Sequence, residues 1–182
     1  AVVAELESLD CSVVILQHDL PAADMTGEEF SPSVYCADFT DFSRLAGTVG
    51  DIRETHGPVT ALLHLAPLAA GGAFPYADLS AWKAETAIMI KSLFYLTKLL
   101  AADLAAANTA NVAGIVAATA MGGTFASVIE TPETAEPDFS PIAGGVSGFL
   151  KALAEEMPGL NVRVVDNDPG DAPQIIASQI TN

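Results

Sequence analysis

Two kinds of hydrophobic pattern alternate along the chain. Short apolar runs rich in β-branched residues are typical of buried parallel strands, and longer segments with apolar residues three and four positions apart are typical of helices. The strand-like runs are residues 11–17, 33–39, 58–69 with an exit loop, 113–118 and 161–166, and the helix-like segments are residues 1–9, 39–57, 80–107 and 143–157. Because the two alternate without a run of hairpins, the pattern predicts an α/β fold. We expect a doubly wound, mostly parallel, Rossmann-like sheet between two layers of helices.

Two of the predicted helices carry further signals. The helix over residues 39–57 has Asp41 as a suitable N-cap and Gly57 as a suitable stop. The long helix over residues 80–107 carries one apolar stripe, which consists of Trp82, Met89, Leu93, Leu96, Leu100 and Leu104. A stripe of this kind packs on a sheet or faces a partner helix, and one helix can do both because it has more than one face.

The composition indicates one folded domain. The chain has 182 residues, of which 51% are hydrophobic and 16% are charged, so we expect a single domain over residues 1–182 rather than a disordered chain. Its 23 Asp and Glu against 7 Lys and Arg give a formal net charge of −16. A field of that sign repels nucleic acid and anionic membranes, so neither is an expected partner.

Cysteine and histidine usage argues against a secreted or metal-binding protein. Cys11 and Cys36 each adjoin a strand-like run, and we expect both to be buried small hydrophobes in a reducing compartment rather than a disulfide. The chain shows no signal peptide and no apolar run of about 18 residues, so we expect a cytoplasmic location. His18, His56 and His64 have no metal-ligand spacing, so we expect no metal.

The order of elements is unusual at its start. A doubly wound domain normally begins with a strand whose exit loop carries G-x-G-x-x-G, the fingerprint that holds phosphates. This chain begins with a helix, and its sequence contains no such glycine pattern. We therefore expect the fold to lack its first strand and phosphate loop, which are either absent or supplied from outside the chain.

The stretch GIVAATAMGGTFA, residues 114–126, predicts a buried strand that continues into a glycine-rich loop. Ligand sites of α/β folds lie at such carboxyl ends of strands. Glycines in this stretch and in the later pair Gly144 and Gly145 allow close approach of a ligand, and they equally allow turns with positive φ or tight helix packing. Where a reactive hydroxyl is expected, the sequence has Ala120.

Four segments carry a resemblance to a known family. They are CADFTD at 36–41, LLHLAP at 62–67, IKSLFYLTKLL at 90–100 and GGVSGFLKALAEEMPGLNVRVVDNDP at 144–169. In this order and spacing they resemble the short-chain dehydrogenase/reductase superfamily, and more narrowly the ketoreductase-type domains of type I polyketide and polyunsaturated fatty acid synthases. The resemblance implies NADPH as the cofactor, if one is bound, and flanking synthase domains and an acyl carrier protein as partners. It also implies a homodimer through the helix over residues 80–107, and a chain that is a fragment of a larger multidomain synthase.

The resemblance assigns five cofactor-binding positions. Asp38 and Phe39 correspond to the strand end that lies beside the adenine, and His64, Leu65 and Ala66 correspond to the strand end that borders the cofactor. The residues themselves leave alternatives open. Asp38 is equally suited to end a strand and start a turn, and His64 suits a satisfied histidine of the core better than a ligand or a base.

The catalytic positions implied by the resemblance are only partly filled. In the family, a serine and a tyrosine hydroxyl polarise a ketone, the tyrosine donates a proton, and a lysine and an asparagine assist. Lys91 falls at the lysine position, Thr119 precedes Ala120 at the serine position, and Ser147 falls at the asparagine position. The tyrosine position falls near Ala143, and the sequence has no tyrosine there or later.

These positions favour a non-catalytic, ketoreductase-like structural domain of a polyketide or fatty acid synthase, which scaffolds neighbouring domains. Lys91 is then a helix lysine that reaches water past an apolar stripe, and Thr119 is an ordinary strand residue. The first alternative is an active NADPH-dependent reductase of carrier-protein-bound β-ketoacyl thioesters. Its proton chemistry then rests on Lys91 and Thr119, or on another hydroxyl such as Ser140 or Ser147. The second alternative is a stand-alone module that binds a nucleotide or an acyl chain.

Overall fold

The computed structural model describes residues 1–18, 34–69, 78–108, 114–127 and 140–181. Its elements are, in chain order, α1 (Val2–Ser8), β1 (Ile15–His18), β2 (Val34–Ala37), α2 (Phe42–His56), β3 (Ala61–His64), the 3₁₀ helix η1 (Ala66–Ala69), α3 (Leu79–Thr86), the π-helical turn η2 (Ala87–Lys91), α4 (Ser92–Asn108), β4 (Gly114–Thr119), α5 (Ile142–Glu156), β5 (Asn161–Asp166) and α6 (Pro173–Thr181). The glycine- and proline-containing stretch at 70–76 and most of the loop predicted at 127–141 lie outside the described residues.

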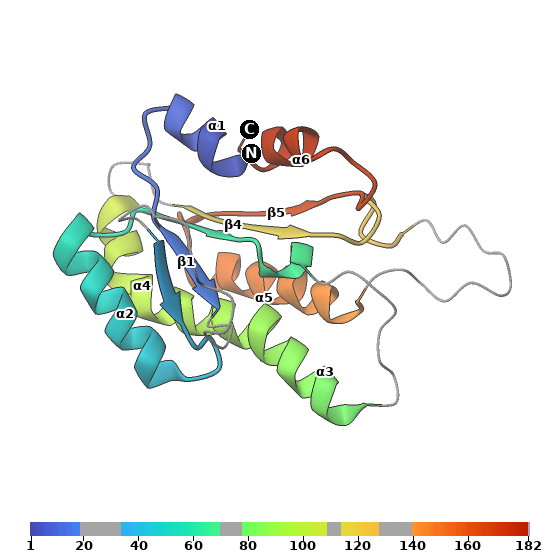
Figure 1. Ribbon diagram of the computed structural model, residues 1–182, viewed down its shortest axis with the longest axis horizontal. Coiled ribbons are helices and arrows are strands. Elements are labelled where there is room, and N and C mark those ends of the chain that lie inside the picture. Colours follow the sequence, from blue (N-terminus) through green and yellow to red (C-terminus); the bar gives the residue numbers. More distant parts are fainter. Residues whose placement is uncertain (19–33, 70–77, 109–113, 128–139, 182) are drawn as a thin grey trace, which may run out of the picture.

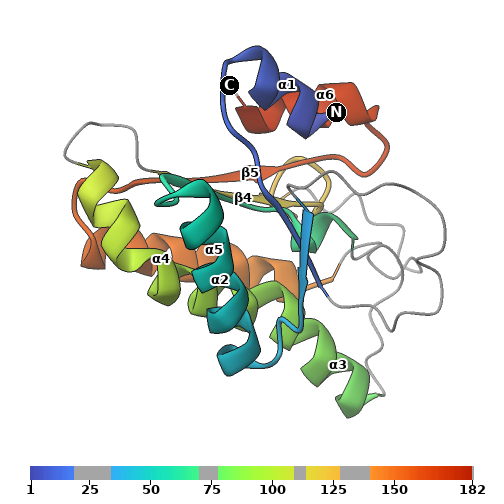
Figure 2. The same cartoon turned by 60° about the vertical axis from the view of Figure 1, so that its left-hand side comes forward.

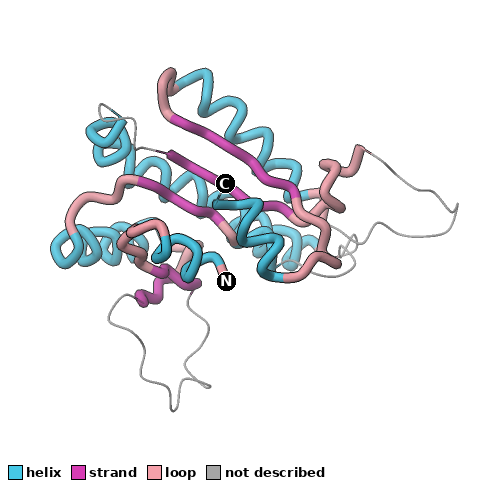
Figure 3. The backbone as a smooth tube through the Cα atoms, turned by 90° about the horizontal axis from the view of Figure 1, so that it is seen from above, coloured by secondary structure: helices cyan, strands magenta, loops and turns pink. Residues whose placement is uncertain are grey.

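The strands form two parallel sheets, β1–β2 and β3–β4–β5, with β4 in the middle of the larger sheet. Helices α1 and α6 cover one face of β4 and β5, and α4 and α5 cover the other (Figure 1). The turned view places α2 beside α4 (Figure 2). Seen from above, the three strands of the larger sheet lie side by side and the short pair lies apart from them (Figure 3). The predicted α/β fold with parallel strands and helices on both faces is therefore confirmed.

The long predicted helix is interrupted. It consists of α3, the π turn η2 and α4. The division arises because residues 87–91 form a wider helical turn, which accommodates one extra residue. The stripe residues of the later part are buried, namely Met89, Leu93, Leu96, Leu100 and Leu104. Trp82 precedes the π turn and is 42% exposed, so its place in the stripe was wrong. The extra residue changes the helical register, which a sequence period cannot anticipate.

The ends of α2 agree with their sequence signals. The Asp41 carboxylate accepts hydrogen bonds from the backbone N–H groups of Ser43 and Arg44, at 2.8 and 3.1 Å. At the other end, Gly57 has a φ of 85°, a left-handed conformation that a residue with a Cβ adopts at a cost. Both predicted termini of this helix are confirmed.

Helix α6 is not among the predicted elements. It begins with Pro173, and proline at the first position of a helix is the signal that could have revealed it. Its carboxyl end is fixed to the sheet by Arg163, whose Nη2 donates to the carbonyls of Gln179 and Ile180 at 2.6 and 2.9 Å. Strand β5 therefore holds the helix that covers it together with α1.

The prediction that both cysteines are buried was wrong. Cys11 and Cys36 are free and exposed. Cys11 precedes β1, which is shorter than the predicted strand and begins at Ile15. In β2, side chains alternate between the two faces, and Ala37 enters the core while Cys36 points the other way. The apolar surroundings of a cysteine in sequence therefore did not reveal which face of its strand is covered.

None of the helices within the described ranges has both the length and the apolar character needed to cross a membrane.

An ion pair connects the helix layer to the larger sheet. Arg53 Nε on α2 donates to Asp103 Oδ2 on α4 at 2.7 Å, and its Nη2 donates to the Leu99 carbonyl. The same carboxylate oxygen accepts the backbone N–H of Val59, just before β3, at 3.1 Å. The Asp103 side chain is only 14% exposed, so its charge depends on this guanidinium for compensation.

We predict that Arg53→Ala lowers the free energy of unfolding by about 2 kcal/mol, because it leaves a mostly buried carboxylate without its cation. The matched control is Arg44→Ala on the same helix. Arg44 lies 3.8 Å from Asp41 in an exposed pair, so its loss changes stability by less than about 1 kcal/mol. Urea unfolding at neutral pH measures both, and equal losses for the two variants would contradict the prediction.

Candidate functional site

The carboxyl ends of the parallel strands point to one edge of the fold, where ligands bind in α/β proteins. His18 ends β1, Asp38 follows β2, Leu65 follows β3, Thr119 ends β4 and Asp166 ends β5. This carboxyl edge contains most of the residues that the sequence singled out. The polar groups at its two ends are arranged differently.

At the end of β4 and β5, one carboxylate accepts three hydrogen bonds. Asp166 accepts hydrogen bonds from the Thr119 hydroxyl at 2.7 Å and from the backbone N–H groups of Met121 and Phe125, each at 2.8 Å. Thr119 is fully buried. Its hydroxyl, which the sequence offered as a substitute proton donor, is thus engaged within the fold.

Asp166 and its neighbour Asn167 hold a strained turn. Gly122 and Gly123 have φ values of 85° and 74°, as their sequence pattern allowed, and two residues with side chains, Phe125 and Ala126, also have positive φ. The Asn167 carbonyl accepts the N–H of Gly123 at 3.1 Å, and its side-chain amide donates to the Thr119 carbonyl at 3.0 Å. Sequence reasoning missed both residues, although two polar residues directly after a buried strand are a usable signal.

The positions proposed for serine, tyrosine and asparagine are not brought together with Lys91 by any described contact. Ala120 has no donor, and Ala143 is buried in the core. The Ser147 hydroxyl is buried, has no described hydrogen-bond partner, and belongs to a groove of about 680 Å³ between α5, β5 and the turn after β4. Lys91 is exposed and ends the π turn on the neighbouring helix.

The π turn that carries Lys91 is fixed from two sides. His64 at the end of β3 is only 3% exposed, and its Nε2 donates to the Met89 carbonyl at 2.7 Å. From the other side, α5 approaches so closely that a Cβ at Gly145 would overlap Cδ1 of Ile90. The interpretation of His64 as a satisfied core histidine is confirmed, and Gly145 serves tight helix packing. Both residues hold the backbone next to Lys91.

Burial determines the charge of His64. It lowers the pKa of the imidazole to about 4, although the hydrogen bond to Met89 acts in the opposite direction. The ring is therefore neutral at physiological pH, with its proton on Nε2 because a carbonyl accepts there. A neutral histidine directed into the core provides packing and a hydrogen bond rather than acid–base chemistry.

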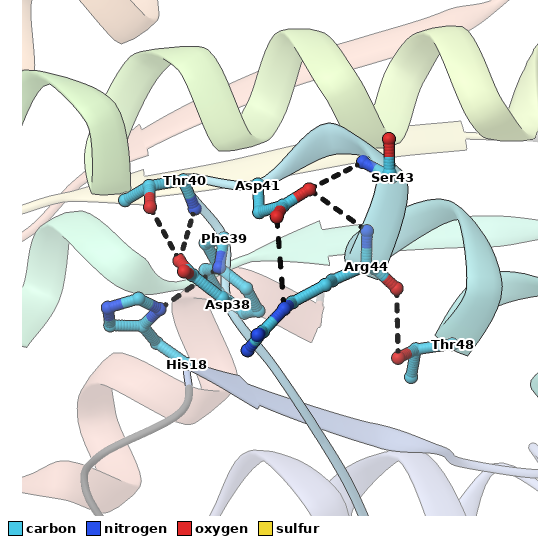
Figure 4. Close-up of polar contacts among 8 residues, drawn as sticks. All are labelled: His18, Asp38, Phe39, Thr40, Asp41, Ser43, Arg44 and Thr48. Atoms are coloured by element: carbon cyan, nitrogen blue, oxygen red, sulfur yellow. Dashed lines mark hydrogen bonds and ion pairs between the residues drawn. The ribbon is translucent and has the colours of Figure 1, made fainter.

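At the other end of the carboxyl edge, the predicted adenine-binding residues differ in exposure, since Asp38 is partly exposed and the Phe39 side chain is buried in the core. Asp38 Oδ1 accepts from the backbone N–H and the hydroxyl of Thr40, at 2.8 and 2.6 Å, which confirms that Asp38 starts a turn (Figure 4). The Thr40 hydroxyl, and after it the Thr40 N–H, lower the pKa of the carboxyl, so it stays ionised. The Phe39 N–H donates to Nδ1 of His18 at 3.1 Å. An ionised carboxylate beside a backbone donor suits the edge of a nucleobase, so the chemistry of these two groups fits the adenine end of a dinucleotide, although the amide is bonded to His18 here.

Leu65 and Ala66, the remaining cofactor positions, leave β3 and enter the 3₁₀ helix η1. Both are partly exposed at the carboxyl edge. Among the described residues, no group of three or more His, Cys, Asp or Glu side chains is placed to hold a metal ion.

The chain is similar to known proteins over most of its length. A family model described as short chain dehydrogenase matches residues 1–173. The chain is 27% identical to nodulation protein G of Azospirillum brasilense over 154 residues, which cover 82% of this chain and 59% of that protein. It is 25% identical to acetoacetyl-CoA reductase of Allochromatium vinosum over 167 residues, which cover 88% of this chain and 64% of that protein.

Solved structures agree on the fold. Serine dehydrogenase of Escherichia coli superposes with a TM-score of 0.69 at 17% identity, over 99% of this chain and 82% of that one. A metagenomic short-chain oxidoreductase in complex with NADP superposes with a TM-score of 0.64 at 18% identity, over 99% of this chain and 81% of that one. The chain spans about three-fifths of the length of nodulation protein G and of acetoacetyl-CoA reductase.

We predict that acid destabilises the fold through His64. Because the pKa of the buried imidazole is about 4 against 6.5 for an exposed one, the unfolded chain binds the proton first. This contribution to stability is full above about pH 6.5, falls as the pH is lowered towards 4, and amounts to about 3 kcal/mol in total.

The test compares the wild type with His64→Gln, whose side-chain N–H₂ replaces Nε2–H without titrating. Urea unfolding at pH 7 and pH 4 measures both proteins. The wild type loses more stability between the two pH values than the variant. If the two proteins lose the same amount, His64 is not the group responsible.

Proposed function

The chain belongs to the short-chain dehydrogenase family, and we propose that it serves as a non-catalytic structural domain of a polyketide or fatty acid synthase. The proposal rests on one observation. At the carboxyl end of β4, the only hydroxyl of the Thr119–Ala120 pair is buried and donates to Asp166, so it is already engaged within the fold. Loss of a positioned proton donor costs roughly 10²- to 10⁴-fold in rate.

The surroundings of this pair support the same proposal. Asp166 already accepts three donors, and the turn after β4 is held by the backbone carbonyl of Asn167, so the Thr119 hydroxyl and the Asp166 carboxylate are engaged within the fold. Ala143, assigned to the tyrosine position, is in the core. A domain with these features provides surfaces for neighbouring domains and no proton to a ketone.

A nicotinamide dinucleotide, NADPH in our proposal, would be held with its adenine against Asp38 and Phe39 and its remainder along Leu65 and Ala66. When bound, the cofactor supplies hydride, and the protein supplies binding and orientation. Asp38 contributes an ionised acceptor, and Phe39 contributes a backbone donor. The structural role does not require that the dinucleotide binds.

A second candidate is an active reductase of carrier-protein-bound β-ketoacyl thioesters. Two observations favour it. Lys91 is exposed on a π turn, and single π turns within helices occur frequently at functional sites. One of the relatives is an acetoacetyl-CoA reductase. In this case Ser140 or Ser147, whose buried hydroxyls have no described partner, would take the proton chemistry.

We further propose that copies of the chain pair through the outer face of α3 and α4. The buried stripe of this helix packs on the sheet, and its other side presents Trp82 and Phe94, which are 42% and 48% exposed. Phe94 lies 6.2 Å from the ring of Phe149 on α5 and 5.9 Å from the ring of Tyr95. An aromatic surface across two neighbouring helices is suited to a partner helix pair.

We predict that the full-length polypeptide containing this domain oxidises no NADPH at this site with an acetoacetyl thioester. The measurement is the loss of NADPH absorbance. It compares the wild type with Lys91→Ala and with the control Lys83→Ala, which removes an exposed lysine of the preceding helix. Lys91→Ala and Lys83→Ala should both show the same loss of NADPH absorbance per minute as the wild-type polypeptide, since none of that loss arises at this site. Turnover that is lost with Lys91→Ala alone would reject the structural role and establish the reductase.

We predict that Phe94→Glu converts a dimer of the chain into a monomer, because the charge has to be desolvated in the interface. Sedimentation velocity measures the oligomeric state. The matched control is Ile175→Glu on α6, on the opposite face of the sheet, where the wild-type side chain is also 48% exposed. A wild-type monomer, or equal dissociation by both variants, would contradict this prediction.

A further inference from the structure

The imidazole of His18 occupies the end of the neighbouring strand. His18 is the last residue of β1, and its Nδ1 accepts the backbone N–H of Phe39, just beyond β2 (Figure 4). The His18 and Phe39 rings also contact each other, with centroids 5.3 Å apart and planes tilted by 47°. Because Nδ1 accepts, the neutral ring carries its proton on Nε2. A flat heteroaromatic ring thus takes the only hydrogen bond that the Phe39 amide can donate.

The groups beneath this ring form a donor–acceptor pair. The Phe39 N–H is the donor, and the ionised carboxylate of Asp38 is the acceptor. Thr40 occupies Oδ1 of the carboxylate and fixes the orientation of the side chain. A nucleobase edge, such as that of adenine, presents a ring nitrogen that accepts beside an exocyclic amine that donates. The pair is therefore complementary to a base edge, and His18 satisfies half of it.

The position in the fold also suits a nucleotide. In open α/β sheets, ligands bind outside the carboxyl ends of strands where the strand order changes direction. Here β1 pairs with β2 on one side, whereas β3 pairs with β4 in the other sheet. His18 and Asp38 end the two strands of the smaller sheet, at the same carboxyl edge as Leu65. A base that accepts a hydrogen bond from the Phe39 amide would have to displace the imidazole.

We propose that His18 is an intramolecular competitor, which occupies the base-binding amide of Phe39 and must swing away before a nucleotide binds. The inference rests on the proposed function in one respect, namely that adenine binds at the end of β2. It adds that, in the protein without a nucleotide, the His18 imidazole occupies the Phe39 amide at this end. The affinity for a nucleotide is then reduced by the fraction of molecules in which His18 is bound to Phe39.

The competing explanation is that His18 merely satisfies an amide that would otherwise be left unpaired. The two explanations differ in their effect on binding. A competitor weakens the binding of any ligand that needs the amide, and its removal strengthens that binding. A purely structural partner leaves the binding unchanged or, when removed, weakens it by loosening the turn around Asp38.

The experiment measures the dissociation constant of adenosine 5′-monophosphate by calorimetry at neutral pH. The variant His18→Ala removes the acceptor, and His18→Asn keeps it, because Asn Oδ1 takes the position of His Nδ1. His56→Ala is the matched control, since His56 also makes one hydrogen bond near β2, to the Tyr35 hydroxyl at 3.1 Å. Ribose 5-phosphate, which has no base, is the control ligand. Circular dichroism establishes that each variant is folded.

We expect His18→Ala to bind adenosine 5′-monophosphate about 3- to 10-fold more tightly than the wild type, as expected for release of one hydrogen bond. His18→Asn and His56→Ala should resemble the wild type, and ribose 5-phosphate should show no difference among the four proteins.

Equal or weaker nucleotide binding by His18→Ala would overturn the competition while leaving the nucleotide site in place. No binding by any of the four proteins would reject the nucleotide site itself, whereas the structural role is tested separately by NADPH turnover. If His18→Ala fails to fold, tighter binding by His18→Asn than by the wild type would overturn the proposal.

Discussion

The carbonyl of Met89 determines how the helix layer meets the larger sheet. It lies in the π turn, where the regular helical hydrogen bonds are shifted, and it faces a core in which an unpaired carbonyl is costly. His64 resolves this with a neutral imidazole from the end of β3, and Gly145 on α5 leaves the space for the side chain of Ile90. These two contacts fix the π turn between β3 and α5, and they thereby fix the backbone next to the exposed Lys91.

The carboxyl edge combines a closed half with a half that can open. At the end of β4 and β5, the Thr119 hydroxyl and the Asp166 carboxylate are engaged with each other and with the turn that follows, whereas Asn167 Oδ1 has no hydrogen-bond partner among the described residues. At the end of β1 and β2, the Phe39 amide is satisfied by a side chain that needs only a rotation to leave. In the proposed structural domain, the first end therefore lacks a free Thr119 hydroxyl, and the second end keeps the Asp38 carboxylate and the Phe39 amide side by side.

The sequence predicted what depends on local pattern and missed what depends on distant contacts. The order of strands and helices follows from hydrophobic period, and the limits of α2 follow from Asp41 and Gly57, whose signals are local. The π turn was missed because it depends on His64 and Gly145, which are far away in sequence. The exposure of Cys36 depends on which face of β2 is covered, and the role of Asp166 depends on a strand pairing with Thr119. Of the candidate site, Asp38, Leu65 and Thr119 at the strand ends were found, but Asp166 and the hydrogen bond of His18 to Phe39 were missed.

The parallel pairing of the larger sheet also has a consequence for folding kinetics. Each partner strand is about 50 residues away along the chain, as for Ala61 with Gly114 and Gly114 with Asn161, so no hairpin can nucleate the sheet. The helices, whose contacts are local, can form early, whereas the strands pair only after long loops have closed. Thr119 meets Asp166 only when β4 and β5 are in register. The end of β4 and β5 is therefore expected to be among the last parts of the domain to assemble.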